Sequence, residues 1–170
     1  MLVMSIAAYA GHLELSPGFA WIGSMPALIA FSGATLLELG AYYIPWLDNL
    51  LDTIATPAAV VAGIVVTASM VTDVSPFLRW TLAVIAGGGI AGAVQSTTAV
   101  VRAASTGTTF GILNPVIASM EFLGAIVVSI ASVLAPMLAL GLAAAMVAVI
   151  AFGFRSVFRA WKQDRSPVSA

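Results

Sequence analysis

The fold is decided by residues 116–154, which read VIASMEFLGAIVVSIASVLAPMLALGLAAAMVAVIAFGF. Glu121 is the only charged residue in this stretch. One straight helix of this length would measure roughly 58 Å, about twice the hydrocarbon thickness of a bilayer. The stretch therefore predicts two membrane crossings. We place the join between them near Ala135 and Pro136, because proline interrupts a helix.

The rest of the chain has the same apolar character. Its 170 residues are 61% hydrophobic and 8% charged, and the mean hydropathy is +1.10. A soluble domain carries about 25% charged residues, because its surface must stay hydrated. The apolar runs are rich in Ala, Leu, Val and Ile and lack the alternation of an outer-membrane barrel. The spanning elements are therefore predicted to be helices.

Four further apolar stretches precede residue 116. Residues 2–11 cover only half a bilayer, which predicts a half-span or a helix whose start is missing. The stretches at residues 19–44, 57–72 and 80–101 are each expected to cross the membrane. The sequence thus predicts an all-α, polytopic membrane bundle with about five full transmembrane helices plus a short N-terminal segment. Residues 1–154 are expected to form this single membrane-embedded domain.

Two linking segments have distinct compositions. Residues 46–56 place Asp48 and Asp52 on one helical face and aliphatic side chains on the other, which predicts a short interfacial helix. The two aspartates are candidates for a second polar cluster, the alternative being the solvated face of that interfacial helix. Residues 103–114 are rich in Ser, Thr and Gly and carry no charge, so we expect a loop before the helix that Pro115 opens.

The cationic residues predict the orientation of the bundle. The tail at residues 155–170 sets cations beside Val157, Phe158 and Trp161, as expected of a basic amphipathic segment on anionic headgroups. Cytoplasmic flanks collect Lys and Arg, so we expect the C-terminus in the cytoplasm and the protein in the cytoplasmic (inner) membrane. The aspartates of residues 46–56 and the loop after Arg102 then also face inward. The cations of the tail are Arg155, Arg159, Lys162 and Arg165.

Two glutamates lie inside predicted spans. Glu38 is about seven residues before the inner end of its helix and Glu121 about six after the inner start of its own, so both should lie roughly 10 Å inside the membrane. Ionisable groups at such depth usually face the bundle interior and mark an ion, proton or substrate route. If the two carboxyls approach each other, one would hold a proton or a cation would bridge them. The alternative is that each only fixes helix packing through hydrogen bonds.

One predicted helix carries the remaining candidates. Arg102 follows a polar run that starts at Gln95, and we expect both to belong to the same pathway as the glutamates, with Arg102 paired to a glutamate or to the Asp48 and Asp52 pair. The alternative for Arg102 is an orienting charge at the headgroups. Gly88 and Gly92 have the spacing that lets two helices approach closely, and we expect this packing role. The alternative is that the triple glycine at residues 87–89 breaks the helix and exposes carbonyls to an ion.

Several kinds of chemistry lack the residues they need. Without cysteine, the chain has no disulfide, thiolate or Cys-based metal site, and its single histidine, His12, has no second ligand at metal spacing. No Ser-His-Asp set and no phosphate-binding glycine loop is found. We therefore predict no catalytic residue, no metal and no cofactor, and we do not expect an enzyme. The net charge of −1 also argues against a nucleic-acid partner.

The run ELGAYYIPWLD at residues 38–48, followed by Asp52 and Pro57, resembles a family of small bacterial multi-pass membrane proteins known only as a domain of unknown function. That family shows a Glu, then an Ala-Asp-Lys-Ile-Pro pattern, then an Asp, and later a Pro that opens the next span. Arg102 and the run at residues 119–121 are similar to its downstream pattern of a Lys- or Arg-bearing helix end and a Ser-x-Glu-Asp.

The resemblance covers about residues 14–154 and includes departures. Tyr42 and Tyr43 stand where the family tends to have Asp and Lys, Phe122 replaces the second acidic residue, and Gln95 lies near where a His is usual. An upstream segment of the family is also missing. The resemblance implies a multi-pass membrane protein and brings no known activity.

Together these features lead us to expect the passage of a small ion or solute through the site of the two glutamates. The competing hypothesis is a non-transporting scaffold or accessory subunit of a larger membrane complex. The expected partners are the lipid bilayer and a second copy of the chain or another membrane protein, because short helices with small-residue faces leave packing surface unsatisfied.

Overall fold

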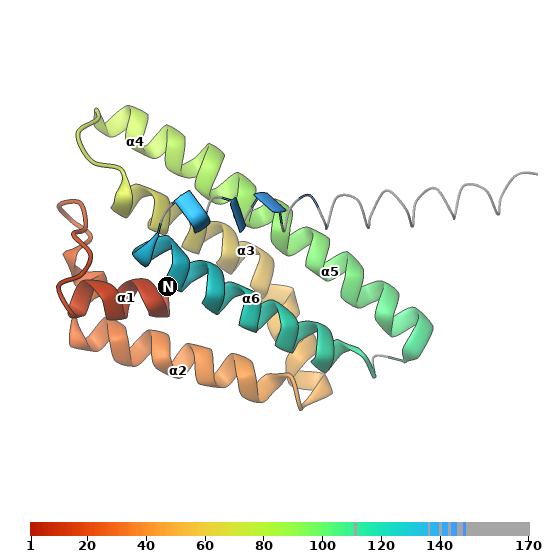
Figure 1. The fold of residues 1–170 in the computed structure, drawn as a ribbon. Coiled ribbons are helices and arrows are strands. Elements are labelled where there is room, and N and C mark those ends of the chain that lie inside the picture. The colour runs from red at the N-terminus through yellow and green to blue at the C-terminus, as the bar shows by residue number, and fades with distance from the viewer. Residues whose placement is uncertain (111, 136, 140, 143, 146–147, 149–170) are drawn as a thin grey trace, which may run out of the picture.

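The chain is mostly helical in the part that the computed structural model describes (Figure 1). This part comprises residues 1–110, 112–135, 137–139, 141–142, 144–145 and 148, without the side chains at positions 45, 46, 48, 49, 52, 108 and 109. No strand is present in it. The prediction of an all-α bundle of apolar helices is confirmed.

The helices differ in length. In chain order they are α1 (Leu2–Tyr9), the 3₁₀ turn η1 (Ala20–Gly23), α2 (Met25–Ala41), α3 (Pro45–Met70), α4 (Pro76–Leu82), the π-helical η2 (Ala83–Gly88), α5 (Gly89–Thr109) and α6 (Asn114–Leu134). Within the described residues, three stretches are long and apolar enough to cross a membrane, at Thr53–Met70, Pro76–Gly107 and Asn114–Leu134. The helix α2 is apolar but shorter, with 17 residues. The crossing expected after Ala135 lies largely outside the described residues.

Serine, proline and backbone conformation set the helix ends. The Ser24 hydroxyl accepts a hydrogen bond from the Ala27 N–H at the start of α2, as expected of an N-cap. Phe110 adopts a left-handed conformation with φ of 54° and ends α5. Ala135, which precedes a proline, leaves the helical region and ends α6. The break therefore lies at the expected join.

The prediction of a separate interfacial helix at residues 46–56 is wrong. The helix α3 runs without a break from Pro45 to Met70 and carries Pro57 in its interior. Proline in a membrane helix is tolerated when neighbouring groups satisfy the freed backbone. Asp48 and Asp52 lie in the first two turns of α3, and their side chains are outside the described part.

The prediction of a loop at residues 103–114 is also wrong. The helix α5 continues to Thr109, and only residues 110–113 connect it to α6. The Thr106 hydroxyl donates to the Arg102 carbonyl oxygen at 3.0 Å, four residues earlier in the same helix. Hydroxyl side chains in apolar surroundings bond to their own helix in this way, whereas in water they favour turns.

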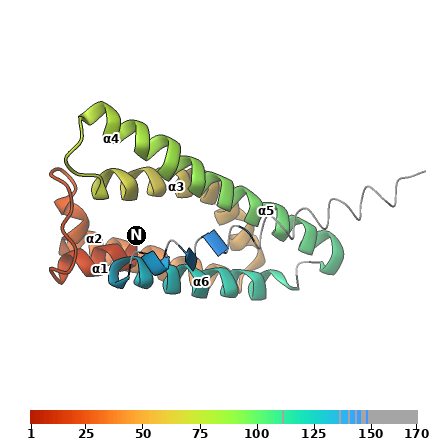
Figure 2. The ribbon, with the colours of Figure 1, turned by 45° about the horizontal axis from the view of Figure 1, so that its top comes forward.

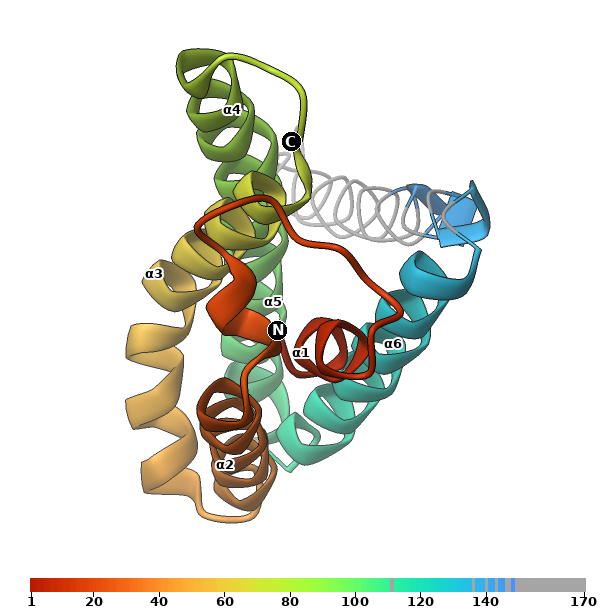
Figure 3. The same ribbon diagram turned by 90° about the vertical axis from the view of Figure 1, so that its left-hand side faces the viewer.

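The helices form two groups that are joined by helix connections at one end and by the segment around Ser16, which bonds to the end of α3, at the other (Figures 1 and 2). In one group, α4, η2 and α5 make a single long helix, and α3 packs along η2 and α5. In the other group, α1 contacts both α2 and α6, as Figure 3 shows from the end of the bundle. The α2–α3 and α5–α6 connections lie at the same end (Figure 1). The C-terminal turns of α2 and α5 are thereby brought to the first turns of α3 and α6.

Glycines allow the backbones of α3 and the long helix to touch. A Cβ atom on Gly63 would overlap the Gly87 carbonyl oxygen, and a Cβ atom on Gly87 would overlap that of Gly63. A Cβ atom on Gly88 would lie 2.8 Å from Ile64 Cγ1, and one on Gly92 would lie 2.9 Å from Val60 Cγ2. The structure thus places Gly88 and Gly92 against α3, and the triple glycine continues the helix as a π turn instead of breaking it.

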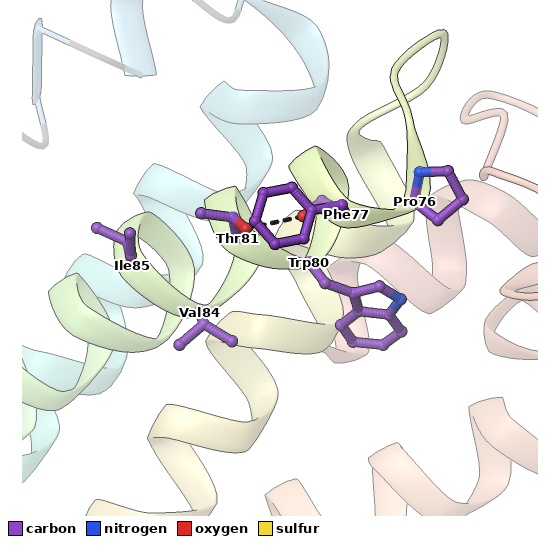
Figure 4. Close-up of a pocket in the computed structure, with 6 residues that line it drawn as sticks. All are labelled: Pro76, Phe77, Trp80, Thr81, Val84 and Ile85. Atoms are coloured by element: carbon purple, nitrogen blue, oxygen red, sulfur yellow. Dashed lines mark hydrogen bonds between the residues drawn. The ribbon is translucent and has the colours of Figure 1, made fainter.

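Large apolar side chains point outward on most helices. Phe77, Ile85 and Met120 are examples from the long helix and from α6. An open apolar groove runs along α4 and η2 and is lined by Pro76, Phe77, Trp80, Thr81, Val84 and Ile85 (Figure 4). Such a surface suits hydrocarbon and would be costly in water. Together with the long apolar helices, this surface identifies a membrane protein.

The glycine contact between α3 and η2 gives a first testable prediction. Gly87→Ala should lower the free energy of unfolding by about 1–3 kcal/mol, because the added Cβ atom forces the two backbones apart. Gly33→Ala in α2 is the matched control, because a Cβ atom there meets nothing within 4 Å. It should leave stability unchanged or raise it by up to about 1 kcal/mol through helix propensity. Reversible unfolding in detergent micelles measures both, and equal effects would contradict the close packing.

Candidate functional site

Four polar side chains meet at the end of the bundle where α2, α5 and α6 come together. We call Glu38, Tyr42, Arg102 and Glu121 the polar cluster. Glu38 lies in the last turn of α2, and Tyr42 is the first residue after that helix. Arg102 lies about two turns before the end of α5, and Glu121 about two turns after the start of α6. The α5–α6 hairpin therefore holds Arg102 and Glu121 at the same level.

Arg102 and Glu121 form an ion pair between neighbouring helices. Arg102 Nη2 lies 3.1 Å from Glu121 Oε2, and the two side chains are 9% and 36% exposed. A guanidinium this well buried needs a charged or hydrogen-bonding partner, because removing it from water costs several kcal/mol. The Arg102 side chain is thus buried among the helices.

Tyr42 connects this ion pair to Glu38. The Arg102 guanidinium carbon lies 5.7 Å from the centre of the Tyr42 ring, a cation–π distance worth about 0.5–2 kcal/mol. The Tyr42 hydroxyl donates to Glu38 Oε1 at 3.2 Å. Glu38 and Tyr42 are four residues apart, so they share one face of the chain at the end of α2. A continuous series of contacts therefore runs from Glu38 through Tyr42 and Arg102 to Glu121.

The structure joins the two glutamates indirectly. They occupy the same end of the bundle, with Tyr42 and Arg102 between them in the series of contacts. The Arg102 guanidinium therefore supplies the positive charge beside Glu121 that the sequence-based prediction assigns to a bridging cation. The helix α2 ends at Ala41, closer to Glu38 than the roughly seven residues expected from the sequence. Tyr42 was not predicted as a site residue. Its spacing of four from Glu38 was visible in the sequence, but its contact with Arg102 depends on how the helices pack.

The remaining residues predicted from the sequence either lie apart from this series of contacts or have side chains outside the part that the structure describes. Gln95 is half-buried in α5, about 10 Å along the helix axis from Arg102 on the side away from the α5–α6 connection. The side chains of Asp48 and Asp52 are outside the described part, although their turns of α3 start at the same end of the bundle. Among the residues that the structure describes, no three His, Cys, Asp or Glu side chains group closely enough to hold a metal ion.

The carboxylates of the polar cluster are more accessible than its cation. Glu38 is exposed and Glu121 is partly exposed, whereas Arg102 and Tyr42 are buried. Chemically, the Arg102–Glu121 ion pair can hold helices α5 and α6 in register. The accessible Glu38 carboxyl can exchange a proton or a small cation with its surroundings.

The ion pair gives a second prediction. Glu121→Gln should lower the free energy of unfolding by about 1–3 kcal/mol, because it leaves a buried guanidinium without this charged partner. The loss should stay below that of a fully buried pair, since Glu121 is partly exposed to its surroundings. Glu14→Gln, at an exposed position outside the helices, is the matched control and should have no measurable effect. Identical unfolding curves for the two variants in detergent micelles would refute a structural ion pair.

Comparison with known proteins agrees with the resemblance seen in the sequence. The model of one family, described as a domain of unknown function (DUF4126), matches residues 1–156. No curated protein and no solved structure gives a significant match. Because the match covers nearly the whole chain, this protein belongs to the DUF4126 family, a domain of unknown function.

Proposed function

We propose that this protein lets a small ion or solute cross the membrane, with the polar cluster on its route. The observation that carries the proposal is that one buried arginine, Arg102, pairs with Glu121 and lies against Tyr42, whose hydroxyl bonds to Glu38, in a chain that is only 8% charged. Ionisable groups within membrane helices are costly and usually mark a transport pathway.

The residues of the cluster suit different roles. Arg102 and Glu121 form the fixed part, because they are paired and the cation is buried. Glu38 suits the exchanging part, because its carboxylate is exposed and is held by the neutral Tyr42 hydroxyl. Gln95 lies about two turns before Arg102 in α5 and offers a polar side chain toward the other face. It stands at the far end of a polar run that includes Ser96, Thr97 and Thr98.

The charge of the tail supports a location and an orientation. We propose that the protein lies in the bacterial inner membrane with its C-terminus in the cytoplasm, since the four cations after residue 154 follow the last apolar stretch. The polar cluster then lies on the cytoplasmic side. We also propose that the exposed apolar faces contact lipid and a second copy of the chain or another membrane protein.

The second candidate is a non-transporting scaffold or accessory subunit. It is favoured by the contacts within the polar cluster, because they tie α2, α5 and α6 together as purely structural hydrogen bonds would. The two candidates differ in what neutralising Glu38 should do. In a scaffold, neutralising Glu38 should lower only the stability of the protein. In a transporter, it should lower the rate of ion flux.

Flux through reconstituted protein tests the proposal. In liposomes with imposed gradients of H⁺, Na⁺ and K⁺, the wild-type protein should carry at least one of these ions, and Glu38→Gln should reduce that flux about tenfold or more. Glu14→Gln should keep the wild-type rate. If Glu38→Gln and Glu121→Gln leave both flux and stability unchanged, the polar site is refuted. If wild-type protein carries none of these ions, or if the variants change only stability, ion passage fails and the scaffold stands.

The proposed orientation can be tested because the chain has no cysteine of its own. Single cysteines at Glu14 and at Ile112 mark the connections at the two ends of the bundle. A membrane-impermeant maleimide should label Glu14→Cys in intact spheroplasts and label Ile112→Cys only in inverted vesicles. The reverse pattern would place the polar cluster on the outer side.

A further inference from the structure

The contacts of the polar cluster pass through one side chain. Glu38 and Glu121 lie on different helices, and the described contacts between them run through Tyr42. We propose that Tyr42 is a positioning residue that couples the two carboxylates. Loss of charge on Glu38 then weakens the contact of Tyr42 with Arg102, and with it the Arg102–Glu121 ion pair. This coupling concerns regulation of the site of the proposed function, but its test requires no transport.

The geometry supplies a physical route for the coupling. The Tyr42 hydroxyl donates to Glu38, and the face of the same ring lies against the Arg102 guanidinium. Donating a hydrogen bond to a carboxylate shifts electron density from the phenol oxygen into the ring, and a more negative ring face attracts a cation more strongly. A charged Glu38 therefore strengthens the contact between Tyr42 and Arg102. A neutral Glu38 weakens it.

Burial favours a rigid connection. Tyr42 is 9% exposed, and its ring and hydroxyl oxygen move as one unit because the oxygen is bonded directly to the rigid aromatic ring. A shift of the hydroxyl toward or away from Glu38 must then move the ring under Arg102. The neighbouring Tyr43 is 77% exposed, which makes it a matched control for the loss of a tyrosine hydroxyl.

Other charged groups lie near the polar cluster, and the test must keep their charges constant. The amino group of Met1, at the start of α1, interacts electrostatically with Glu38. Arg102 and Glu121 act on Tyr42 from α5 and α6. The side chains of Asp48 and Asp52 on α3 lie outside the described part. A change of pH would alter several of these groups together, so the test holds pH constant and neutralises one carboxyl at a time.

A double-mutant cycle measures the coupling. Unfolding equilibria in detergent micelles are compared for the wild-type protein, Glu38→Gln, Glu121→Gln and the double variant. With Tyr42 present, the double variant should deviate from additivity by roughly two- to tenfold in the unfolding equilibrium constant, as contacting networks do. In the Tyr42→Phe background, which keeps the ring and removes the hydroxyl, the two changes should become additive. In the Tyr43→Phe background, the deviation should persist.

The possible outcomes test the coupling through Tyr42 independently of the proposed transport. Additive effects with Tyr42 present would overturn the coupling, and so would an equal deviation with and without the Tyr42 hydroxyl. If Glu121→Gln does not fold, Arg102→Lys replaces it in the same cycle, since lysine keeps the charge and removes the guanidinium that lies over the ring. A coupling found in a protein that carries no ion would leave this inference standing and refute transport alone.

Discussion

The structure depends on the cost of leaving a polar group unpaired in hydrocarbon. For the backbone, this cost selects helices, because a helix satisfies its N–H and C=O groups within one segment. For side chains, it requires that a buried charge find a partner. Arg102 illustrates the second requirement, since its guanidinium is buried between helices and pairs with Glu121 at 3.1 Å. The same requirement brings the ends of α2, α5 and α6 together.

The constraint also explains how the rest of the bundle is held. Lipid tails are as apolar as leucine, so hydrophobic burial does not drive one membrane helix onto another. Close van der Waals contact must replace it, and the crossing of Gly63 and Gly87 provides that contact between α3 and the long helix. At the opposite end of the bundle from the polar cluster, buried serine hydroxyls add hydrogen bonds. Ser5 donates to the Ile22 carbonyl oxygen, and Ser16 donates to that of Ala68.

The sequence predicted the features that follow from hydropathy alone. The long apolar runs predicted the fold class, and the proline after Ala135 predicted the break at that residue. The sequence-based prediction failed where turn and helix propensities measured in water do not apply to a membrane helix. Residues 103–109 read as a loop because Ser, Thr and Gly favour turns in water, yet Thr106 bonds to its own helix. Tyr42 was missed because its role depends on Arg102, sixty residues later in the sequence.

Solid-state NMR of the protein in lipid bilayers tests the central claim most directly. Selective labelling of the guanidinium nitrogens of arginine and the side-chain carboxyl carbons of glutamate would report the Arg102–Glu121 separation through dipolar coupling, with Glu121→Gln to assign the signal. We expect a measurable nitrogen–carbon dipolar coupling, as a nitrogen–oxygen distance near 3.1 Å requires. If no coupling is lost in the Glu121→Gln variant, the buried ion pair does not exist in the membrane, and the polar cluster built around it does not exist either.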